Sequence, residues 1–333
     1  MSSARDLSTP PAAGTRRFQV LSLSGGGVRG LYTACVLEGL EARAGVPLNQ
    51  CFDLIAGTSI GGILAAGLAL GRRASEVRAI VERAAPKIFP ARGGAWRAVR
   101  GLFRARFPSA PLRAVIEEVV GADTRLADLA TPLLVPAVGL TAGAAQTFRS
   151  PHHGAHALHA GTRLVDVALS TAAAPLVFPA ARVGEAEYLD GGFIAHAPDA
   201  LAVHEAQVFF ACRRSDIFML SVGTTQDLTA LAAGGNPSRG LLWWMSRNRL
   251  SEVAMGAQQA LSQQLAREAL GDRYLAINTP RSRHQAGVIA LDRADARALA
   301  TLKAMARHAL EHAAASPALP RFLAHRAASA PDC

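Results

Sequence analysis

The chain contains few cysteines, few aromatic residues and little charge for its length. Of its 333 residues, 5% are aromatic, 18% are charged and four are cysteines. Cys35, Cys51, Cys212 and Cys333 show no CxxC or other ligand-like spacing, which argues against a cysteine metal site and predicts free thiols in a reducing compartment. Half of the residues are hydrophobic, mostly Ala, Leu and Val, which is enough to form a sizeable α/β core.

The sequence also lacks an evident secretory signal and an uninterrupted membrane span. Met1–Arg17 contains no apolar stretch of the kind that a signal peptide needs. Leu54–Gly71 is uncharged and nearly long enough to span a bilayer, but Gly57, Ser59 and Gly61 interrupt it. This composition fits a buried strand, turn and helix better than a lipid-facing helix. We therefore expect a soluble, cytoplasmic protein.

The chain has fewer acidic than basic residues, 25 against 35. The formal net charge is +10 and the isoelectric point is near 10.6, with almost all of the basic charge on arginine. This balance favours an anionic partner, either a membrane surface or a phosphate-bearing ligand. An arginine-rich surface that is simply solvated is the alternative, and composition does not separate the two.

Strand-like and helix-like segments alternate along the chain, which predicts an α/β sheet with helices on both faces. The expected strands are Phe18–Leu23, Phe52–Ala56, Leu133–Leu140, Gln146–Arg149, Glu187–Leu189, Ile217–Val222 and Tyr274–Ile277. The expected helices are Leu31–Arg43, Ile60–Leu70, Ala74–Ala85, Pro111–Val120, Leu164–Ala173, Pro198–Glu205, Leu241–Leu270 and Asp292–His312. No internal repeat is visible.

A glycine-rich turn follows the first expected strand. It reads Ser24-Gly25-Gly26-Gly27-Val28-Arg29-Gly30. Consecutive glycines let backbone N–H groups converge on a phosphate or on an oxyanion that develops during a reaction. The turn lacks the Lys-Ser/Thr ending of a P-loop, and its glycine spacing is not that of a dinucleotide-binding loop.

A second turn, Gly57-Thr58-Ser59-Ile60-Gly61, has the pattern G-x-S-x-G between an expected strand and an expected helix. That is the setting of a nucleophile elbow, in which flanking glycines allow a tight turn and the serine hydroxyl is exposed. A structural Gly/Ser turn is the simpler alternative for the pentapeptide alone.

A third turn, Asp190-Gly191-Gly192, follows the short expected strand Glu187–Leu189. A serine hydroxyl needs a base within about 3 Å to become a nucleophile. An aspartate followed by glycines can approach that closely.

Taken in this order, the three turns resemble the patatin-like phospholipase family. The resemblance covers most of Phe18 to about Val222 and includes the block Ser170-Thr-Ala-Ala-Ala-Pro175 with Phe178-Pro179. It implies a three-layer patatin-like α/β fold with a central, mostly parallel sheet. It also implies a catalytic domain at 17–223, and a helical extension at 224–315 would complete the same domain. Composition, rich in Ser, Pro and Gly, predicts a disordered lead-in at 1–16, and the Ala/Pro-rich end predicts a flexible tail at 316–333.

The resemblance further implies a Ser–Asp dyad. Ser59 would attack the acyl carbonyl and Asp190 would accept its proton, through an acyl-enzyme and without metal or another cofactor. The oxyanion loop would comprise Gly25, Gly26 and Gly27, braced by Arg29. His196 stands where family members often carry Asn, and we interpret it as a tolerated structural exchange.

A narrower resemblance, to the patatin effectors of bacterial anti-phage (CBASS) systems, lies in the strings LSLSGGGVRGLYTACVLEGLE, FDLIAGTSIGGILAAGLALG and DGGFIAHAPDALAVHEA. It implies activation by a cyclic nucleotide, such as a cyclic dinucleotide, and attack on the phospholipid of the cell's own membrane. The enzyme would then act peripherally at the inner membrane. We expect no nucleic-acid partner, and the sequence leaves a homo-oligomer open.

A basic and aromatic segment, Arg92–Arg106, allows three interpretations. Its candidate contacts are Trp96, Arg97, Arg100, Phe103 and Arg104. It could lie on an anionic bilayer, hold ligand phosphates, or form an ordinary lid helix with a solvated basic side. A second such cluster, Trp243, Trp244, Met245, Arg247 and Arg249, allows the same three.

Four histidines, His152, His153, His156 and His159, occur in a Gly/Pro-containing loop. The loop offers no acidic or cysteine partner, so we interpret them as surface histidines and assign no metal.

Two further alternatives for the function of the chain stay open. One is a catalytically silent, nucleotide-sensing binding module. The other is an α/β-hydrolase triad that uses His284, His308 or His312.

Overall fold

The computed structural model describes residues 17–90, 104–227 and 249–327. The predicted lead-in at 1–16 lies outside these residues, as do Trp96, Arg97, Arg100 and Phe103 of the first basic segment. Trp243, Trp244, Met245 and Arg247 of the second cluster, and Cys333, also lie outside them.

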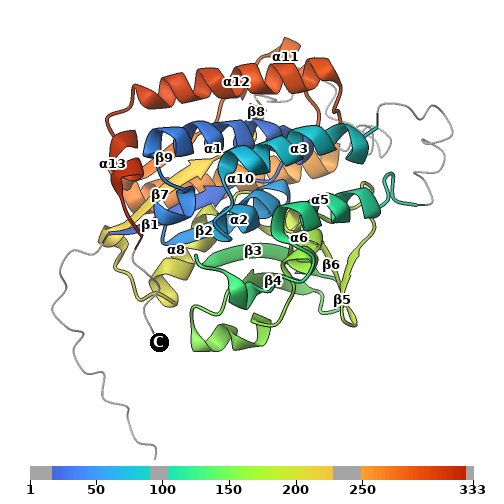
Figure 1. Ribbon diagram of the computed structural model, residues 1–333, viewed down its shortest axis with the longest axis horizontal. Helices are drawn as coiled ribbons and strands as arrows, with labels where there is room; N and C mark the ends of the chain where they lie inside the picture. The colour runs from blue at the N-terminus through green and yellow to red at the C-terminus, as the bar shows by residue number, and fades with distance from the viewer. Residues whose placement is uncertain (1–16, 91–103, 228–248, 328–333) are drawn as a thin grey trace, which may run out of the picture.

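An eight-stranded sheet forms the centre of the molecule, with strand order β5-β6-β3-β2-β1-β7-β9 and with β4 paired to β3 (Figure 1). The strands β1, β2, β3, β7 and β9 pair in parallel, whereas β4, β5 and β6 pair in antiparallel. The strands are β1 Phe18–Leu23, β2 Leu54–Gly57, β3 Leu133–Gly139, β4 Ala144–Arg149, β5 Ala181–Val183, β6 Ala186–Asp190, β7 Ile217–Val222 and β9 Tyr274–Ile277. Two short strands, β8 Gln226–Asp227 and β10 Pro280–Arg281, pair separately.

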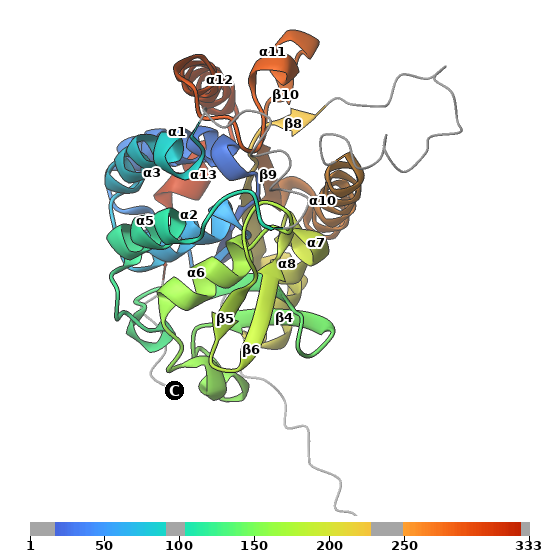
Figure 2. The same ribbon diagram turned by 90° about the vertical axis from the view of Figure 1, so that its right-hand side faces the viewer.

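Helices cover both faces of the sheet (Figure 2). One layer contains α1, α2, α3, α5 and α6, and α12 packs against α1 on the same side. The other layer contains α8 and α10. The helices are α1 Gly30–Ala44, α2 Ile60–Ala69, α3 Ala74–Ile88, α5 Ala110–Val120, α6 Leu164–Ala172, α7 Gly192–Ala195, α8 Asp199–Val208, α10 Arg249–Leu270, α11 Arg283–Val288, α12 Ala296–Ala314 and α13 Leu319–Ala324. This arrangement confirms the predicted three-layer α/β fold with a mostly parallel central sheet.

The two layers bury opposite faces of the same strands. In β1, Leu21 and Leu23 belong to the larger core formed with α1 and α2, whereas Phe18 and Val20 pack with Val203 of α8. Residues that alternate along a strand point to opposite faces, so a strand covered on both sides is mostly apolar, and any polar side chain in it must be hydrogen-bonded. β1 is accordingly apolar except for Gln19 and Ser22, which are fully buried and donate hydrogen bonds to the Cys51 carbonyl and to Asp199 Oδ1.

The predicted flexible tail at 316–333 is wrong for its first half. Leu319–Ala324 forms α13, and Phe322 is only 2% exposed. Its carbonyl accepts a hydrogen bond from Gln19 Nε2 of β1 at 2.8 Å. Leu319, Phe322 and Leu323 form one apolar helical face, which the surrounding Ala and Pro obscured. The predicted final helix is therefore followed by another.

Within the described residues, no helix combines the length and the apolar character needed to cross a bilayer.

Candidate active site

Ser59 occupies a strained turn between β2 and α2. Its backbone has φ 54° and ψ −125°, a conformation that L-residues rarely adopt. The flanking positions must be glycine, because a Cβ at either one would collide with backbone atoms. A Cβ on Gly57 would lie 2.2 Å from the Gly61 carbonyl oxygen, and one on Gly61 would lie 2.4 Å from the Leu23 carbonyl oxygen. The chain therefore forms the predicted strand–turn–helix geometry around this serine.

Asp190 lies against the serine. Ser59 Oγ donates a hydrogen bond to Asp190 Oδ2 at 2.7 Å. Strand β3 brings the two together, because it pairs with β2 at Leu133 and with β6 at Ala137, opposite Asp190. A Cβ on Gly191 would lie 2.1 Å from the Pro136 carbonyl oxygen, so only glycine allows the chain this close to β3.

The Asp190 carboxyl group is buried and held in one orientation. It is 5% exposed, and its Oδ1 accepts the Gly192 N–H at 2.7 Å. Burial raises its pKa from 3.8 to about 6, although the hydrogen bonds from Gly192 and Ser59 oppose this rise. Asp190 is therefore ionised at neutral pH but is a stronger base than an exposed aspartate, as general-base catalysis requires.

This pKa predicts an acid limb in the pH profile. If Asp190 must be ionised to accept the serine proton, kcat/KM should fall about tenfold per pH unit below about pH 6. The measurement is hydrolysis of a soluble short-chain ester between pH 4.5 and pH 8, with folding followed by circular dichroism at each pH. A profile that stays flat down to pH 4.5 while the protein is folded would argue against Asp190 as the base.

The glycine turn after β1 lies beside the serine, but its three amides are not equivalent. A Cβ on Gly25 would lie 3.4 Å from Ser59 Cβ. The Gly25 N–H itself donates to the His196 carbonyl at 2.9 Å. The prediction that Gly25 is an oxyanion donor is therefore wrong, because its amide already binds the segment after Asp190. Among the described residues, the amides of Gly26 and Gly27 have no acceptor and remain free for a ligand.

Arg29 supports this loop from behind. Its side chain is 8% exposed, and its Nε donates to the Gly26 carbonyl at 3.3 Å. Side chains are excluded from the turn, since a Cβ on Gly26 would lie 2.2 Å from Thr224 Oγ1 and one on Gly27 would lie 2.3 Å from the Leu291 carbonyl oxygen. Arg29, Thr224 and Leu291 thus pack around the loop, in keeping with the bracing role expected of Arg29.

Three residues position this site without having been predicted to do so. Thr171 Oγ1 accepts the Ser59 N–H at 2.9 Å and donates to the Pro136 carbonyl at 2.6 Å. Thr58 Oγ1 donates to the Ala195 carbonyl at 2.5 Å. Gln258 of α10 accepts the His196 N–H at 2.5 Å and donates to the Ile194 carbonyl at 2.9 Å. Thr171 belongs to the small-residue block that the sequence singled out, whereas nothing in the sequence distinguishes Gln258 from its neighbours in α10.

His196 is buried next to the dyad but contributes mainly through its backbone. Its imidazole lies over Gly25 and Gly192, and Nδ1 has no hydrogen-bond partner among the described residues. Burial, and then the Arg29 charge, lower its pKa to about 3, so the ring is neutral at physiological pH. The backbone N–H and carbonyl bind Gln258 and Gly25, and these contacts do not depend on the side chain.

We accordingly expect His196→Asn to retain kcat/KM within about tenfold. Loss of a side chain that takes part in acid–base catalysis typically lowers the rate 10²–10⁴-fold, and we assign the His196 imidazole no such part. The matched control is His204→Asn, at an exposed position on α8. A loss above about a hundredfold in the folded His196→Asn variant alone, with a changed pH profile, would instead assign the imidazole a part in proton transfer.

The remaining predicted residues lie elsewhere. Arg104 is exposed, and the chain after it runs beside the segment that follows α6, where the Arg106 and Phe107 N–H groups donate to the Leu176 and Val177 carbonyls. Arg249 begins α10.

The three histidines of the triad alternative are not at the dyad. His284 contacts Arg297, while His308 and His312 lie on α12 and line a surface cavity of about 800 Å³ with β9. The serine and the carboxylate touch directly, with no imidazole between them. The geometry therefore does not support a triad.

A parallel α/β sheet with an activated serine on a strand-to-helix turn defines a serine hydrolase. Comparison with known proteins gives the family. The patatin-like phospholipase family matches residues 21–202. The chain is 38% identical to a Pseudomonas aeruginosa protein named cGAMP-activated phospholipase. The 316 aligned residues cover 94% of each chain. The chain thus belongs to the patatin-like phospholipases, as its three turns predicted.

Other relatives share this family. An Escherichia coli protein of the same name is 32% identical over 321 residues, or 90% of each chain. A second E. coli protein, named cUMP-AMP-activated phospholipase, is 32% identical over 211 residues, covering 62% of this chain and 64% of its own. The likeness to the first two relatives covers 94% and 90% of this chain and is therefore longer than the segment 21–202 that the family matches.

Proposed function

We propose that this phospholipase hydrolyses acyl esters of membrane glycerophospholipid through a Ser59 acyl-enzyme. Ser59 Oγ forms a bond to the ester carbonyl carbon while its proton passes to Asp190 Oδ2. The Gly26 and Gly27 amides stabilise the oxyanion, an interaction typically worth about 3 kcal/mol per donor. The carbon–oxygen bond then breaks, and Asp190 returns the proton to the departing lysophospholipid oxygen. Water, deprotonated by Asp190, releases the fatty acid and regenerates the serine.

The 2.7 Å contact between Ser59 Oγ and Asp190 Oδ2 carries this proposal. A fluorophosphonate probe, which reacts with activated serines, tests it directly. Wild type should be labelled at Ser59, and fatty acid should be released from phospholipid vesicles. If no condition gave labelling or fatty-acid release, the chain would instead be a silent, nucleotide-sensing module on a patatin scaffold.

We also propose that a cyclic dinucleotide activates the enzyme, as the names of its relatives state for those proteins. The reason is coverage, since the most similar of the named relatives aligns over 94% of both chains. Fatty-acid release should be measured across a panel that includes cGAMP and cUMP-AMP. Equal activity with and without every member of the panel would exclude this form of control.

The biological role that we propose is an anti-phage effector that attacks the inner membrane from the cytoplasmic side. The net charge of +10 supports binding to an anionic lipid surface. Cells that express the wild-type chain with a matching nucleotide synthase should resist phage, and cells with Ser59→Ala should not. Equal resistance in both would separate the role from the hydrolysis.

A further inference from the structure

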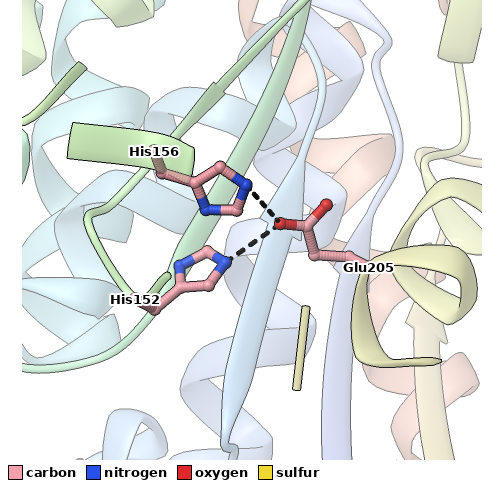
Figure 3. A group of neighbouring side chains, drawn as sticks. All are labelled: His152, His156 and Glu205. Atoms are coloured by element: carbon pink, nitrogen blue, oxygen red, sulfur yellow. Dashed lines mark hydrogen bonds and ion pairs between the residues drawn. The ribbon is translucent and has the colours of Figure 1, made fainter. Parts of the chain in front are cut away.

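Two histidines and a glutamate form a buried cluster away from the dyad (Figure 3). His152 lies in the loop after β4, His156 in the 3-10 helix Gly154–His159, and Glu205 on α8. Both imidazole rings point at the same carboxylate oxygen. Glu205 Oε1 is 2.9 Å from His152 Nε2 and 3.8 Å from His156 Nε2, and the three ligand-type atoms lie within 4.8 Å of one another.

Folding gives the histidine loop the acidic partner that is missing from its own sequence. We assigned no metal there because the loop itself offers no acidic partner. Folding brings in Glu205, which is 53 residues after His152 in the chain. The resulting set of two imidazoles and one carboxylate is a common donor set for zinc and related divalent transition metals.

His156 provides an independent reason to expect a ligand. It is 4% exposed, and neither ring nitrogen has a hydrogen-bond partner among the described residues. Leaving a buried polar group unpaired typically costs about 1–3 kcal/mol, so each such group needs an explanation. A metal ion between His156 Nε2 and Glu205 Oε1 would satisfy one of these nitrogens.

The surroundings orient the three side chains. His152 Nδ1 lies 3.0 Å from Ser150 Oγ, and Arg149 Nε donates to Glu205 Oε2 at 2.8 Å. The rings of Phe209 and Phe210 pack on His156 and His152, with centroids 4.4 and 4.6 Å away. Metal-binding imidazoles and carboxylates are usually held in this way by outer hydrogen bonds and an apolar shell.

We propose that His152 Nε2, His156 Nε2 and Glu205 Oε1 bind a divalent transition metal such as Zn²⁺, with water as the fourth ligand. Ligands about 2.0–2.2 Å from a tetrahedral metal lie roughly 3.3–3.5 Å from one another. His156 Nε2 would therefore move closer to the other two atoms, which lie within 4.8 Å of it, while His152 Nε2 and Glu205 Oε1 would separate from 2.9 Å to make room for the ion. His152 Nε2, which donates to Glu205 without the metal, would become a ligand, and its proton would move to Nδ1 to face Ser150 Oγ. Arg149 Nε also contacts Oε1 at 2.9 Å, so the metal would replace that contact and leave the one to Oε2.

The position of the site indicates a structural role. Arg149 pairs with Leu134 at the beginning of β3, whereas Asp190 pairs with Ala137 further along that strand. A metal would connect the loop after β4 to α8, whose first residue follows Pro198. It would therefore raise the unfolding temperature without entering the hydrolytic reaction.

The test uses the full-length protein, treated with a chelator and then titrated. Zn²⁺ is titrated against a competing chromophoric chelator, and Co²⁺ is followed by its visible absorption. We expect one equivalent per chain, a tetrahedral Co²⁺ spectrum and a higher unfolding temperature. His156→Ala should weaken binding at least tenfold, whereas the matched control His153→Ala, an exposed residue of the same loop, should bind like wild type.

Fluorophosphonate labelling of Ser59 should be equal with metal and with chelator, which keeps this test separate from the proposed hydrolysis. If His156→Ala fails to fold, His156→Asn takes its place, and the Co²⁺ spectrum of wild type still decides. Absence of stoichiometric binding by wild type would overturn the proposal. So would equal affinity in the folded His156 and His153 variants.

Discussion

Ser59→Ala is expected to lower the rate of fatty-acid release by roughly 10⁵-fold, the scale seen when a hydrolase loses its nucleophile. The methyl group cannot form the acyl-enzyme, and what remains is the contribution of the Gly26 and Gly27 amides and of substrate binding. Release of fatty acid from vesicles, with the proposed cyclic dinucleotide present, measures this loss. Fluorophosphonate labelling should disappear in parallel.

The matched control is Ser215→Ala, at an exposed position outside the site, which should leave release and labelling unchanged. Folding of both variants is compared by circular dichroism and thermal unfolding. If Ser59→Ala kept more than about a tenth of the wild-type rate, the nucleophile would have to be sought elsewhere.

Asp190→Asn is expected to lower the rate by roughly 10³- to 10⁴-fold while increasing the stability of the protein. The amide keeps the size of the carboxylate and can still accept the Gly192 N–H, but it cannot take a proton from Ser59. The rate is measured as for Ser59→Ala. Activity near that of wild type would show that another group deprotonates the serine.

The gain in stability follows from the raised pKa of Asp190. Folding raises this pKa from 3.8 to about 6, so the folded chain binds the proton more tightly than the unfolded chain. Below pH 3.8 ionisation costs nothing, and the cost develops as the pH rises through 6. At pH 7 it amounts to roughly 2–3 kcal/mol, which Asn avoids. Urea unfolding should show Asp190→Asn more stable than wild type at pH 7, with the difference gone by about pH 4. An equal difference at both pH values would contradict this account.

A site that costs stability is expected of an enzyme that needs a buried, ionised base. The backbone of Ser59 adds to this cost, because φ 54° is unfavourable for any residue with a Cβ. The contacts from Thr171 and Thr58 hold the turn in that conformation. Such positioning bonds explain how the elbow keeps its strained geometry.

Sequence patterns predicted most of the fold because they report local constraints. The mostly apolar strands β1 and β7 and the periodic helices α1 and α3 lie close to their expected bounds. The tail was misjudged because α13 is stabilised by contact with β1 and not by its own composition. A short helix of this kind depends on burying one apolar face against the rest of the protein.

By itself, the sequence determined the three turns and their chemistry. The spacing of the glycines, the serine and the aspartate within each turn is a local pattern that a motif reports, although the atoms that exclude a Cβ at Gly61 and Gly191 belong to Leu23 and Pro136. Only the tertiary structure decided which groups around these turns are available. It engages the Gly25 amide with His196, raises the pKa of Asp190 by burial and brings Glu205 to the histidine loop. The reason is that hydrogen-bond partners and desolvation come from segments far apart in the chain, whose distances no local spacing encodes.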